Sequence, residues 1–421
     1  MVIDRFVHYN LFIIIIINDN KTMIESDEIL RKLIELFQKF NTINVWSQIT
    51  GKNDFQAEYL GKGNICDVIR CRLNPSILTK ENTKFSSIYH NEIVVKILPD
   101  NIFIKYDPLE ASVINTIICS NGIGPRLFYT DHQYKVYELI DGRTYNYNDD
   151  CNEQTVRKLA RTLARFHRLN VPISNDSQQR WSSMIENLEL MPFYDILESK
   201  AYLPLIKHDE QLRQEYYDFA AKIDIIKLNA NIIRLCHDIS GQSSFVFSHN
   251  DFNRNNRIVC NDHIKLIDLD YSTYYYRGYD LGRYFSNYRH RDDMFGAESF
   301  PTDHEMDIFL NEYRHEMVRK LKCNNTNNNN DDHDHWMDEI LDDDHHQYSL
   351  QQLRAESKAF TLLAYAVDTY FGLWQFTIDP NGSHGKYFLN VAKTRGMELQ
   401  RLIQQFINDD DHKQFVHLYS Q

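Results

Sequence analysis

Polar side chains that could transfer a proton and bind a metal ion are concentrated in one short stretch, residues 249–256. Within it Asp251 lies five residues before Asn256, and a further aspartate, Asp268, follows an apolar segment. A carboxylate can accept the proton of a hydroxyl group, while an amide and a second carboxylate can hold Mg²⁺ against nucleotide phosphates. The residue types therefore indicate phosphoryl transfer, with Asp251 as general base and with Asn256 and Asp268 as Mg²⁺ ligands.

Short apolar segments must position these side chains. Residues 244–247 predict a β-strand that ends at the turn containing Asp251, where side chains face a cleft. Residues 257–267 predict a β-hairpin, and its open end would bring Asn256 and Asp268 close enough to share one cation. Asp268 is expected at the cleft surface, where it contributes little to packing. Each residue alone would favour a purely structural role, but the ordered combination favours the catalytic interpretation.

This combination resembles the choline/ethanolamine kinases, a family of protein-kinase-like small-molecule phosphotransferases. Residues 248–256 match the family segment C-H-N-D-L-x-x-x-N-I. Residues 267–271 and 279–285 follow I-D-x-E-Y-x-x-x-N-Y-x-x-x-D-I-G-N-H-F in order and spacing. The resemblance implies that Asp251 is the catalytic base, that Asn256 and Asp268 bind Mg²⁺, that Asp270 and Tyr271 border the substrate amine, and that Asp280 is a buried structural acid.

A nucleotide-binding half is implied by the same resemblance, which extends from about residue 60 to residue 401. Lys96 lies on a strand whose basic residue, usually Arg in the family, reaches the nucleotide phosphates, and Glu110 is its expected ion-pair partner. Backbone groups at Glu138 and Ile140 would bind adenine in the hinge strand. A turn containing Gly61 and Gly63 takes the place of the phosphate loop, although the family's G-G-x-T/S-N is not preserved.

The implied fold is α+β and protein-kinase-like, with a small β-rich N-lobe and a larger, mainly helical C-lobe. Residues 1–40 are expected to be an N-terminal extension with an amphipathic helix at 27–40. Residues 41–145 would form the nucleotide-binding N-lobe, and residues 146–421 the catalytic and substrate-binding C-lobe. An insertion rich in Asn, Asp and His, residues 324–346, is expected to be a disordered loop rather than a metal site.

Helix-start signals lie on both sides of this insertion. Capping boxes, in which an N-cap hydroxyl and a Glu or Gln three residues later satisfy each other's backbone amides, are indicated at Thr302 with Glu305 and at Ser349 with Gln352. Helices are therefore expected at 302–320 and 349–376.

Composition restricts the partners of the chain. Its 421 residues, 43% hydrophobic and 25% charged, suffice for two lobes with a sizeable core. A net charge of −13 argues against nucleic acid and suits a cationic amine. Seven cysteines without close pairing indicate reduced thiols in the cytoplasm. The apolar run at 11–17 is too short to span a bilayer, which needs about 20 residues, so no stable membrane insertion is expected.

Substrate choice depends on aromatic residues. Residues 370–374 resemble the family's W-G-L-W, whose aromatic rings wall the amine pocket, with Phe371 in place of the first Trp and Trp374 as the second. Asn287 stands where the family commonly has Glu. A quaternary ammonium depends on an aromatic cage and an anion, whereas a primary ammonium can donate hydrogen bonds to Asp270, so ethanolamine is preferred over choline.

The predicted reaction is the ATP- and Mg²⁺-dependent phosphorylation of ethanolamine to phosphoethanolamine, the first step of phosphatidylethanolamine synthesis by the CDP-ethanolamine route. Three alternatives stay open: a choline kinase, a phosphotransferase for another amino alcohol or an aminoglycoside, and a non-catalytic pseudokinase. Homodimer formation is left open as well.

Overall fold

The computed structural model describes ten parts of the chain: residues 23–40, 45–62, 66–77, 91–98, 107–174, a few residues between 210 and 236, 245–291, 300–323, 348–378 and 382–407. They belong to two compact units. The first consists of Met1–Thr144 and Ile258–Asp270, and the second of Tyr145–Arg257 and Tyr271–Gln421. The apolar run at 11–17, Gly63 and the insertion at 324–346 lie outside the described residues, so the predictions about them stay untested.

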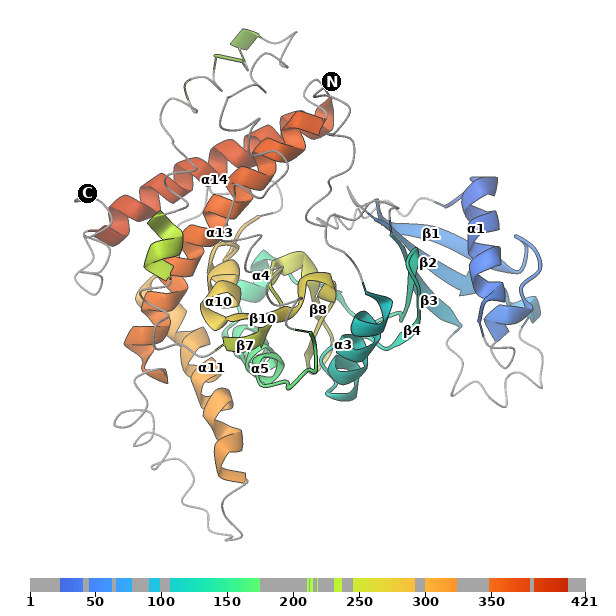
Figure 1. Cartoon of the computed structure of the whole chain (residues 1–421), viewed down its shortest axis with the longest axis horizontal. Helices are drawn as coiled ribbons and strands as arrows, with labels where there is room; N and C mark the ends of the chain where they lie inside the picture. Colours follow the sequence, from blue (N-terminus) through green and yellow to red (C-terminus); the bar gives the residue numbers. More distant parts are fainter. Residues whose placement is uncertain are drawn as a thin grey trace. The chain divides into compact units, whose positions relative to one another are not determined.

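The first unit is built on a five-stranded antiparallel sheet with the order β1-β2-β3-β5-β4 (Figure 1). Its strands are β1 (Phe55–Lys62), β2 (Asp67–Leu73), β3 (Glu92–Ile97), β4 (Leu127–Thr130) and β5 (Tyr134–Glu138). Helix α3 (Pro108–Ser120) connects β3 to β4, and the Asp107 side chain caps it by accepting from the Leu109 N–H at 2.9 Å. Lys96 on β3 lies directly opposite Lys135 on β5. Directly opposed residues project from the same face of a sheet.

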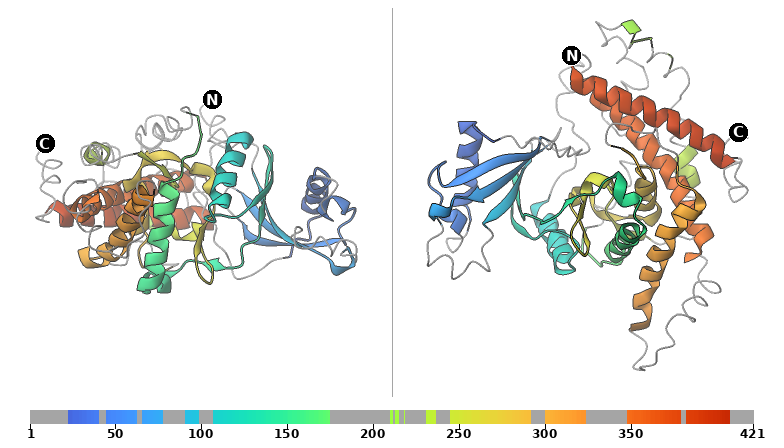
Figure 2. Two further views of the ribbon diagram at one scale, coloured as in Figure 1. Left: turned by 90° about the horizontal axis from the view of Figure 1, so that it is seen from below. Right: turned by 180° about the vertical axis from the view of Figure 1, so that it is seen from behind.

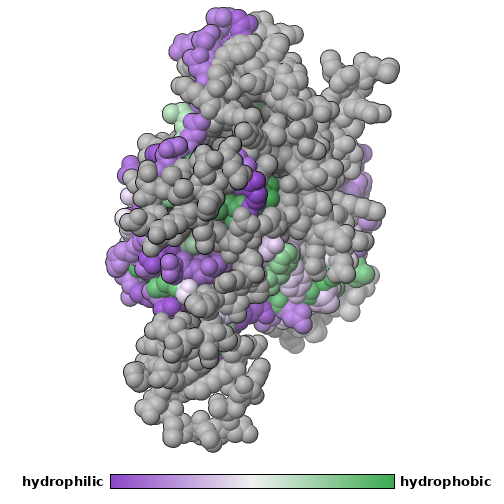
Figure 3. All heavy atoms as spheres, turned by 60° about the vertical axis from the view of Figure 1, so that its left-hand side comes forward, coloured by the Kyte–Doolittle hydropathy of each residue, from purple (hydrophilic) through white to green (hydrophobic). Residues whose placement is uncertain are grey.

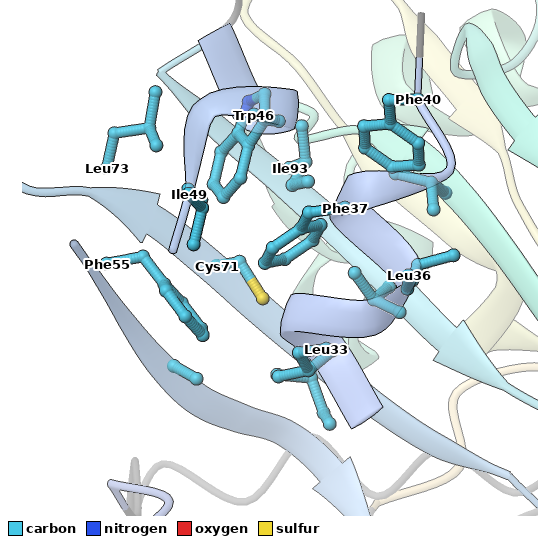
Figure 4. Packing of buried hydrophobic residues seen from close by; sticks show 14 of the residues in the cluster. Leu33, Leu36, Phe37, Phe40, Trp46, Ile49, Phe55, Cys71, Leu73 and Ile93 are labelled. Carbon is cyan, nitrogen blue, oxygen red and sulfur yellow. The ribbon is translucent and has the colours of Figure 1, made fainter. Parts of the chain in front are cut away.

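One face of this sheet is covered by helix α1 (Asp27–Gln38) and the short helix η2 (Val45–Gln48) (Figure 4). Leu33 and Phe37 point from α1 toward the sheet residues Cys71 and Phe55, and Trp46 of η2 contacts Phe37 with ring centroids 4.9 Å apart. Each large apolar side chain buried in this way contributes about 1.5–3 kcal/mol to folding. The amphipathic helix predicted near the N-terminus is confirmed, and it completes the hydrophobic core on one face of the five-stranded sheet.

A second, three-stranded sheet has the order β6-β8-β9. It consists of β6 (Arg143–Thr144), β8 (Arg257–Val259) and β9 (Ile264–Leu266). The turn of the β8–β9 hairpin is closed by the Cys260 N–H, which donates to the His263 carbonyl at 2.9 Å. The predicted hairpin is therefore confirmed. From Ile258 onward it belongs to the first unit, whereas the division made from the sequence assigned it to the C-lobe.

The second unit is mainly helical. Its described elements include the antiparallel pair β7 (Phe245–Ser248) and β10 (Thr273–Tyr276) and the helices α4 (Tyr147–Asp150), α5 (Glu153–His167), α10 (Arg277–Phe285), α11 (Asp303–Cys323), α13 (Leu350–Ile378) and α14 (Ser383–Ile407). A β-rich unit and a mainly helical unit agree with the predicted α+β class.

Both predicted helix starts beside the insertion are present. The Thr302 N–H donates to Glu305 Oε2 at 2.9 Å and the Glu305 N–H donates to Thr302 Oγ1 at 3.3 Å, which completes the capping box of α11. At the start of α13 the Gln352 N–H donates to Ser349 Oγ at 3.1 Å. These local signals were readable because an N-cap is specified by residues that are neighbours in sequence.

Glycines let the long helices of the second unit approach closely. A Cβ atom added to Gly282 of α10 would lie 2.4 Å from the carbonyl carbon of Phe360 on α13. A Cβ atom added to Gly372 of α13 would lie 2.8 Å from the Phe388 carbonyl oxygen on α14. Figure 2 shows α13 and α14 running side by side in further views. Both crossings are tight backbone contacts that exclude any side chain at these two positions.

On the face drawn in Figure 3 the described surface residues are mainly hydrophilic, with small hydrophobic areas between them. Among the described helices, none combines the length and the apolar character that crossing a membrane requires.

Candidate active site

A strained turn after β7 carries the predicted base. Asn250 has φ 64°, in the left-handed region, which an asparagine tolerates better than most residues. The turn is held by Asp280 of α10, whose Oδ2 accepts from the His249 N–H at 2.6 Å and whose Oδ1 accepts from the Asn250 N–H at 2.8 Å. Asn250 Nδ2 donates to the Tyr271 carbonyl at 2.8 Å. The turn conformation is thus fixed from two sides.

Asp280 is fully buried, which confirms its prediction as the structural acid of this unit. Its Oδ2 also lies 3.0 Å from His167 Nε2, while His167 Nδ1 lies 2.7 Å from the Tyr313 hydroxyl oxygen. An ionised carboxylate can only accept, so His167 Nε2 carries the proton and Nδ1 accepts from Tyr313. Burial raises the pKa of Asp280, but the bonds from His167 and His249 outweigh it, so this pKa lies below its ordinary value. Burial lowers the pKa of His167.

Three donors hold the carboxylate of Asp251, which is almost completely buried. Asn253 Nδ2 donates to Asp251 Oδ1 at 2.8 Å, and Asn256 Nδ2 donates to Oδ2 at 2.8 Å. Arg283 Nη2 lies 3.4 Å from Oδ1. The structure therefore brings the predicted base and the predicted metal-ligating amide into direct contact.

Asn256 presents a buried oxygen that suits a hard cation. Its Nδ2 is occupied by Asp251, where it donates to both the carboxylate and the backbone carbonyl. Its Oδ1 is buried without a hydrogen-bond partner among the described residues. A buried amide oxygen that is left unsatisfied calls for an explanation, and coordination of a metal ion is one. The chemistry of this side chain fits the Mg²⁺ role that the sequence predicted.

In the first unit, Lys96 lies in a buried ion cluster with Lys135, Asp268 and Asp270. Lys96 Nζ is 2.7 Å from Asp268 Oδ1 and 2.7 Å from Asp270 Oδ2, and Lys135 Nζ donates to Asp270 Oδ1. Burial opposes the charge of Lys96, but Asp268 and Asp270 raise its pKa well above its ordinary value. Burial likewise opposes ionisation of Asp270, and Lys135 and Lys96 outweigh it and lower its pKa. Two lysines and two aspartates leave the cluster with no net charge.

One expectation from the sequence needs correction here. Asp268 was expected at a cleft surface, but only 2% of its side chain is exposed, because its carboxylate is paired with Lys96. Its φ of 60° also places it in the left-handed region, so strain adds to burial at this position. Each carboxylate oxygen of Asp270 bonds a lysine, and its place beside the substrate amine stays a prediction. Neither residue is a loosely held surface carboxylate.

Lys135 was missed by the sequence analysis. Its signal was a lysine among the aromatic and apolar residues 134–137. In the structure the Lys135 side chain is only 1% exposed. Glu110, the expected partner of Lys96, lies half-buried in the first turn of α3. The contacts of Lys96 described above are with Asp268 and Asp270, so the pair with Glu110 stays a prediction.

The other predicted nucleotide contacts lie on the same unit. Glu138 ends β5, and its N–H donates to the Arg126 carbonyl at 2.9 Å, while Ile140 follows the strand. Gly61 lies near the end of β1, after a register shift between Tyr59 and Gly61. Adenine binding at Glu138 and Ile140 and phosphate binding at Gly61 stay predictions.

Phe371 and Trp374 pack against each other on α13, with ring centroids 5.8 Å apart, and Phe371 also contacts Phe388 of α14 at 5.5 Å. Both residues are largely buried. Asn287 is buried as well, where its Nδ2 donates to the Arg283 carbonyl at 2.8 Å and its Oδ1 accepts from Arg395. The aromatic pair is part of the helical core, and its role in binding an amine stays a prediction.

Comparisons with known proteins agree with this geometry. A family model described as choline/ethanolamine kinase matches residues 73–397. A probable ethanolamine kinase from Arabidopsis thaliana is 28% identical over 46% of this chain and 47% of its own length. A choline kinase from Caenorhabditis elegans is 26% identical over 40% of this chain and 45% of its own. The chain therefore matches about half the length of these curated relatives.

The fold itself is shared with solved structures. A Plasmodium vivax ethanolamine kinase matches with a TM-score of 0.57 and 15% identity, over 90% of this chain and 89% of that one. The predicted protein-kinase-like architecture, with a small antiparallel sheet and a mainly helical remainder, is confirmed.

Proposed function

We propose, from the premise that this chain belongs to the choline/ethanolamine kinase family, that it transfers the γ-phosphoryl group of ATP to the hydroxyl group of an amino alcohol. The observation that carries the proposal is the fixation of Asp251. Both of its carboxylate oxygens are held by amide donors, at 2.8 Å each, on a turn stabilised by Asp280. A base in so defined an orientation is what phosphoryl transfer requires of a protein, because positioning supplies most of the catalysis.

In the proposed reaction Asp251 orients the acceptor hydroxyl and takes its proton as the oxygen attacks the γ-phosphorus. Asn253 and Asn256 keep the carboxylate in place by donating to its two oxygens. Lys96 provides the cation for the nucleotide phosphates from the strand β3. General-base assistance of this kind contributes about 10² to 10⁴ in rate.

Mg²⁺ would be held by Asn256 Oδ1, the buried amide oxygen described above, and by the carboxylate of Asp268. When bound, the ion neutralises charge on the phosphate oxygens of ATP. Asn256 then has two tasks, because its amide nitrogen holds the base while its amide oxygen remains available to the metal.

Ethanolamine is the acceptor that we propose. Recognition of a quaternary ammonium such as choline depends on aromatic faces and an uncompensated anion. Here Phe371 stands in place of a family tryptophan, and both oxygens of Asp270 are already bonded to lysines. A primary ammonium can instead donate hydrogen bonds to carbonyl oxygens. These features favour ethanolamine, and phosphoethanolamine would then serve phosphatidylethanolamine synthesis in the cytoplasm.

The test is ATP turnover with ethanolamine, choline and an aminoglycoside, measured as kcat/KM on wild type, Asp251→Asn and Phe371→Trp. Wild type should prefer ethanolamine, and Asp251→Asn should lose about 10² to 10⁴ in kcat while still binding ATP. Phe371→Trp should reduce the ratio of kcat/KM for ethanolamine to kcat/KM for choline. A wild-type preference for choline would overturn the assignment of ethanolamine as the substrate. A preference for the aminoglycoside would favour a phosphotransferase of that class. No turnover with any of the three acceptors would favour a non-catalytic pseudokinase.

A further inference from the structure

Arg283 is a buried arginine beside the proposed base, at a position where the family motif D-I-G-N-H-F has asparagine. It follows Asp280 by three residues on α10, so the helix that holds the turn also presents this guanidinium. Its Nη2 lies 3.4 Å from Asp251 Oδ1, the oxygen that also accepts from Asn253. The substitution therefore places a permanent positive charge next to the base.

The guanidinium is itself anchored by a chain of charged groups. Arg283 Nη1 donates to Asp368 Oδ1 of α13 at 2.5 Å, and Asp368 Oδ2 lies 3.5 Å from Arg395 Nε of α14. Arg395 Nη1 donates in turn to the Ser286 carbonyl at 2.6 Å, just after α10. Burial opposes the charge of Arg283, but Asp368, Tyr279 and Asp251 together outweigh it, so its pKa is raised.

Charge balance and backbone packing both support a fixed position for this group. Asp251, Arg283, Asp368 and Arg395 carry two negative and two positive charges, which makes the buried chain neutral. Gly282, the residue before Arg283, lies in backbone contact with α13. Because α10 cannot shift against α13 at this point, the Cα atom of Arg283 has a fixed position relative to α13.

Asn253 and Asn256 belong to the same short loop as the base, so they would move with it if the loop moved. Arg283 comes from a different element that is braced against two long helices. A contact from outside the loop limits the orientations of the carboxylate relative to the rest of the unit. A side-chain displacement of about 1 Å can cost about 10² in rate.

We propose that Arg283 is a positioning residue for Asp251, and that Asp368 and Arg395 hold it in place. The inference rests on the proposed function, since it assigns Asp251 the role of base. Arg283 acts through Asp251 and is not assigned a contact with substrate.

The matched control is Arg277 of the same helix. It is buried too, and it forms the same kind of ion pair with α13, where Nε and Nη2 donate to Glu356 at 2.8 and 2.9 Å. Arg283→Met and Arg277→Met therefore remove the same chemical group from the same helix, and each breaks an ion pair with α13. Only the first change removes a contact with Asp251.

The experiment measures kcat, KM for ATP and thermal unfolding for Arg283→Met, Arg283→Lys, Asp368→Asn and Arg277→Met, with each rate normalised to folded protein. Arg283→Met should lower kcat by about 10²-fold with KM for ATP unchanged. Arg283→Lys and Asp368→Asn should show a smaller decrease in kcat. Guanidinium ion added to Arg283→Met at a non-denaturing concentration should restore part of the rate. Arg277→Met should lose stability but keep kcat. Equal kcat in the two methionine variants would overturn the proposal.

A readout without turnover separates this inference from the proposed function. If wild type phosphorylates none of the acceptors, the proposed function fails, and a crystal structure of Arg283→Met decides the positioning claim. An Asp251 carboxylate rotated away from its wild-type orientation would support it. An unchanged orientation would overturn it.

Discussion

Replacing Asp280 by asparagine removes one negative charge and keeps the size of the side chain. In the wild type Oδ2 accepts from the His249 N–H and from His167 Nε2, and Oδ1 accepts from the Asn250 N–H. Asparagine has a single acceptor oxygen, so its best orientation keeps the two bonds at the Oδ2 position and loses the third. The new amide N–H₂ group then faces the Asn250 N–H.

The expected loss in the free energy of unfolding follows from the number of hydrogen bonds lost or weakened. A hydrogen bond to a charged group contributes about 1.5–3 kcal/mol and a neutral one about 0.5–1.5 kcal/mol. One charged bond lost and two weakened to neutral bonds give a decrease of about 4 kcal/mol in the free energy of unfolding. The Asn250 N–H loses its acceptor, so the left-handed turn is held less firmly, the orientation of Asp251 should be less well defined, and kcat should fall by about tenfold or more.

Urea unfolding of wild type and Asp280→Asn, followed by circular dichroism, measures the change. Asp262→Asn is the control, because Asp262 is exposed in the β8–β9 turn and undergoes the same chemical change. The control should stay within about 0.5 kcal/mol of wild type. If Asp280→Asn lost less than about 1 kcal/mol, the view that this carboxylate holds the catalytic turn would be refuted.

Two more measurements follow from the buried groups. Because burial lowers the pKa of His167, this histidine takes up a proton in the unfolded chain below about pH 6.5 while it stays neutral in the folded protein. The free energy of unfolding should therefore keep its full value above that pH and decrease as the pH falls below it. A free energy of unfolding that stays level between pH 7 and 5 would contradict a buried neutral imidazole. Gly282→Ala should lower the melting temperature strongly, because its Cβ would lie 2.4 Å from backbone of α13, whereas Gly51→Ala, with open space at its Cβ, should not; equal melting temperatures would contradict the tight crossing.

Sequence reasoning succeeded where the relevant partners lie within a few residues of each other. Asp251 and Asn256 were selected by their spacing in one loop, and the structure shows their side chains joined by a hydrogen bond. The cap at Thr302 is local in the same way. Asp280 was identified through the family resemblance, and its burial and bonds confirmed it.

The missed features depend on the register and crossing of distant elements. Lys135 joins the ion cluster around Asp270 only because β5 pairs with β3 in the register that places it opposite Lys96. Asp268 was expected to be exposed because its sequence neighbours give no sign of a lysine 172 positions away. Arg283 reaches Asp251 because α10 packs beside the turn, which no local pattern records.

The tight crossing at Gly282 bears on how this site can diverge between related chains. No side chain can be introduced at that position without separating α10 from α13, so it is closed to variation. The side chain of the next residue, Arg283, contacts Asp368 of α13 and Asp251, so a substitution there changes side-chain contacts and leaves the backbone crossing in place. A fixed helix crossing beside a position that can change allows the groups around Asp251 to differ between related chains without a change in the fold. The arginine at position 283, where the family motif has asparagine, is one such difference.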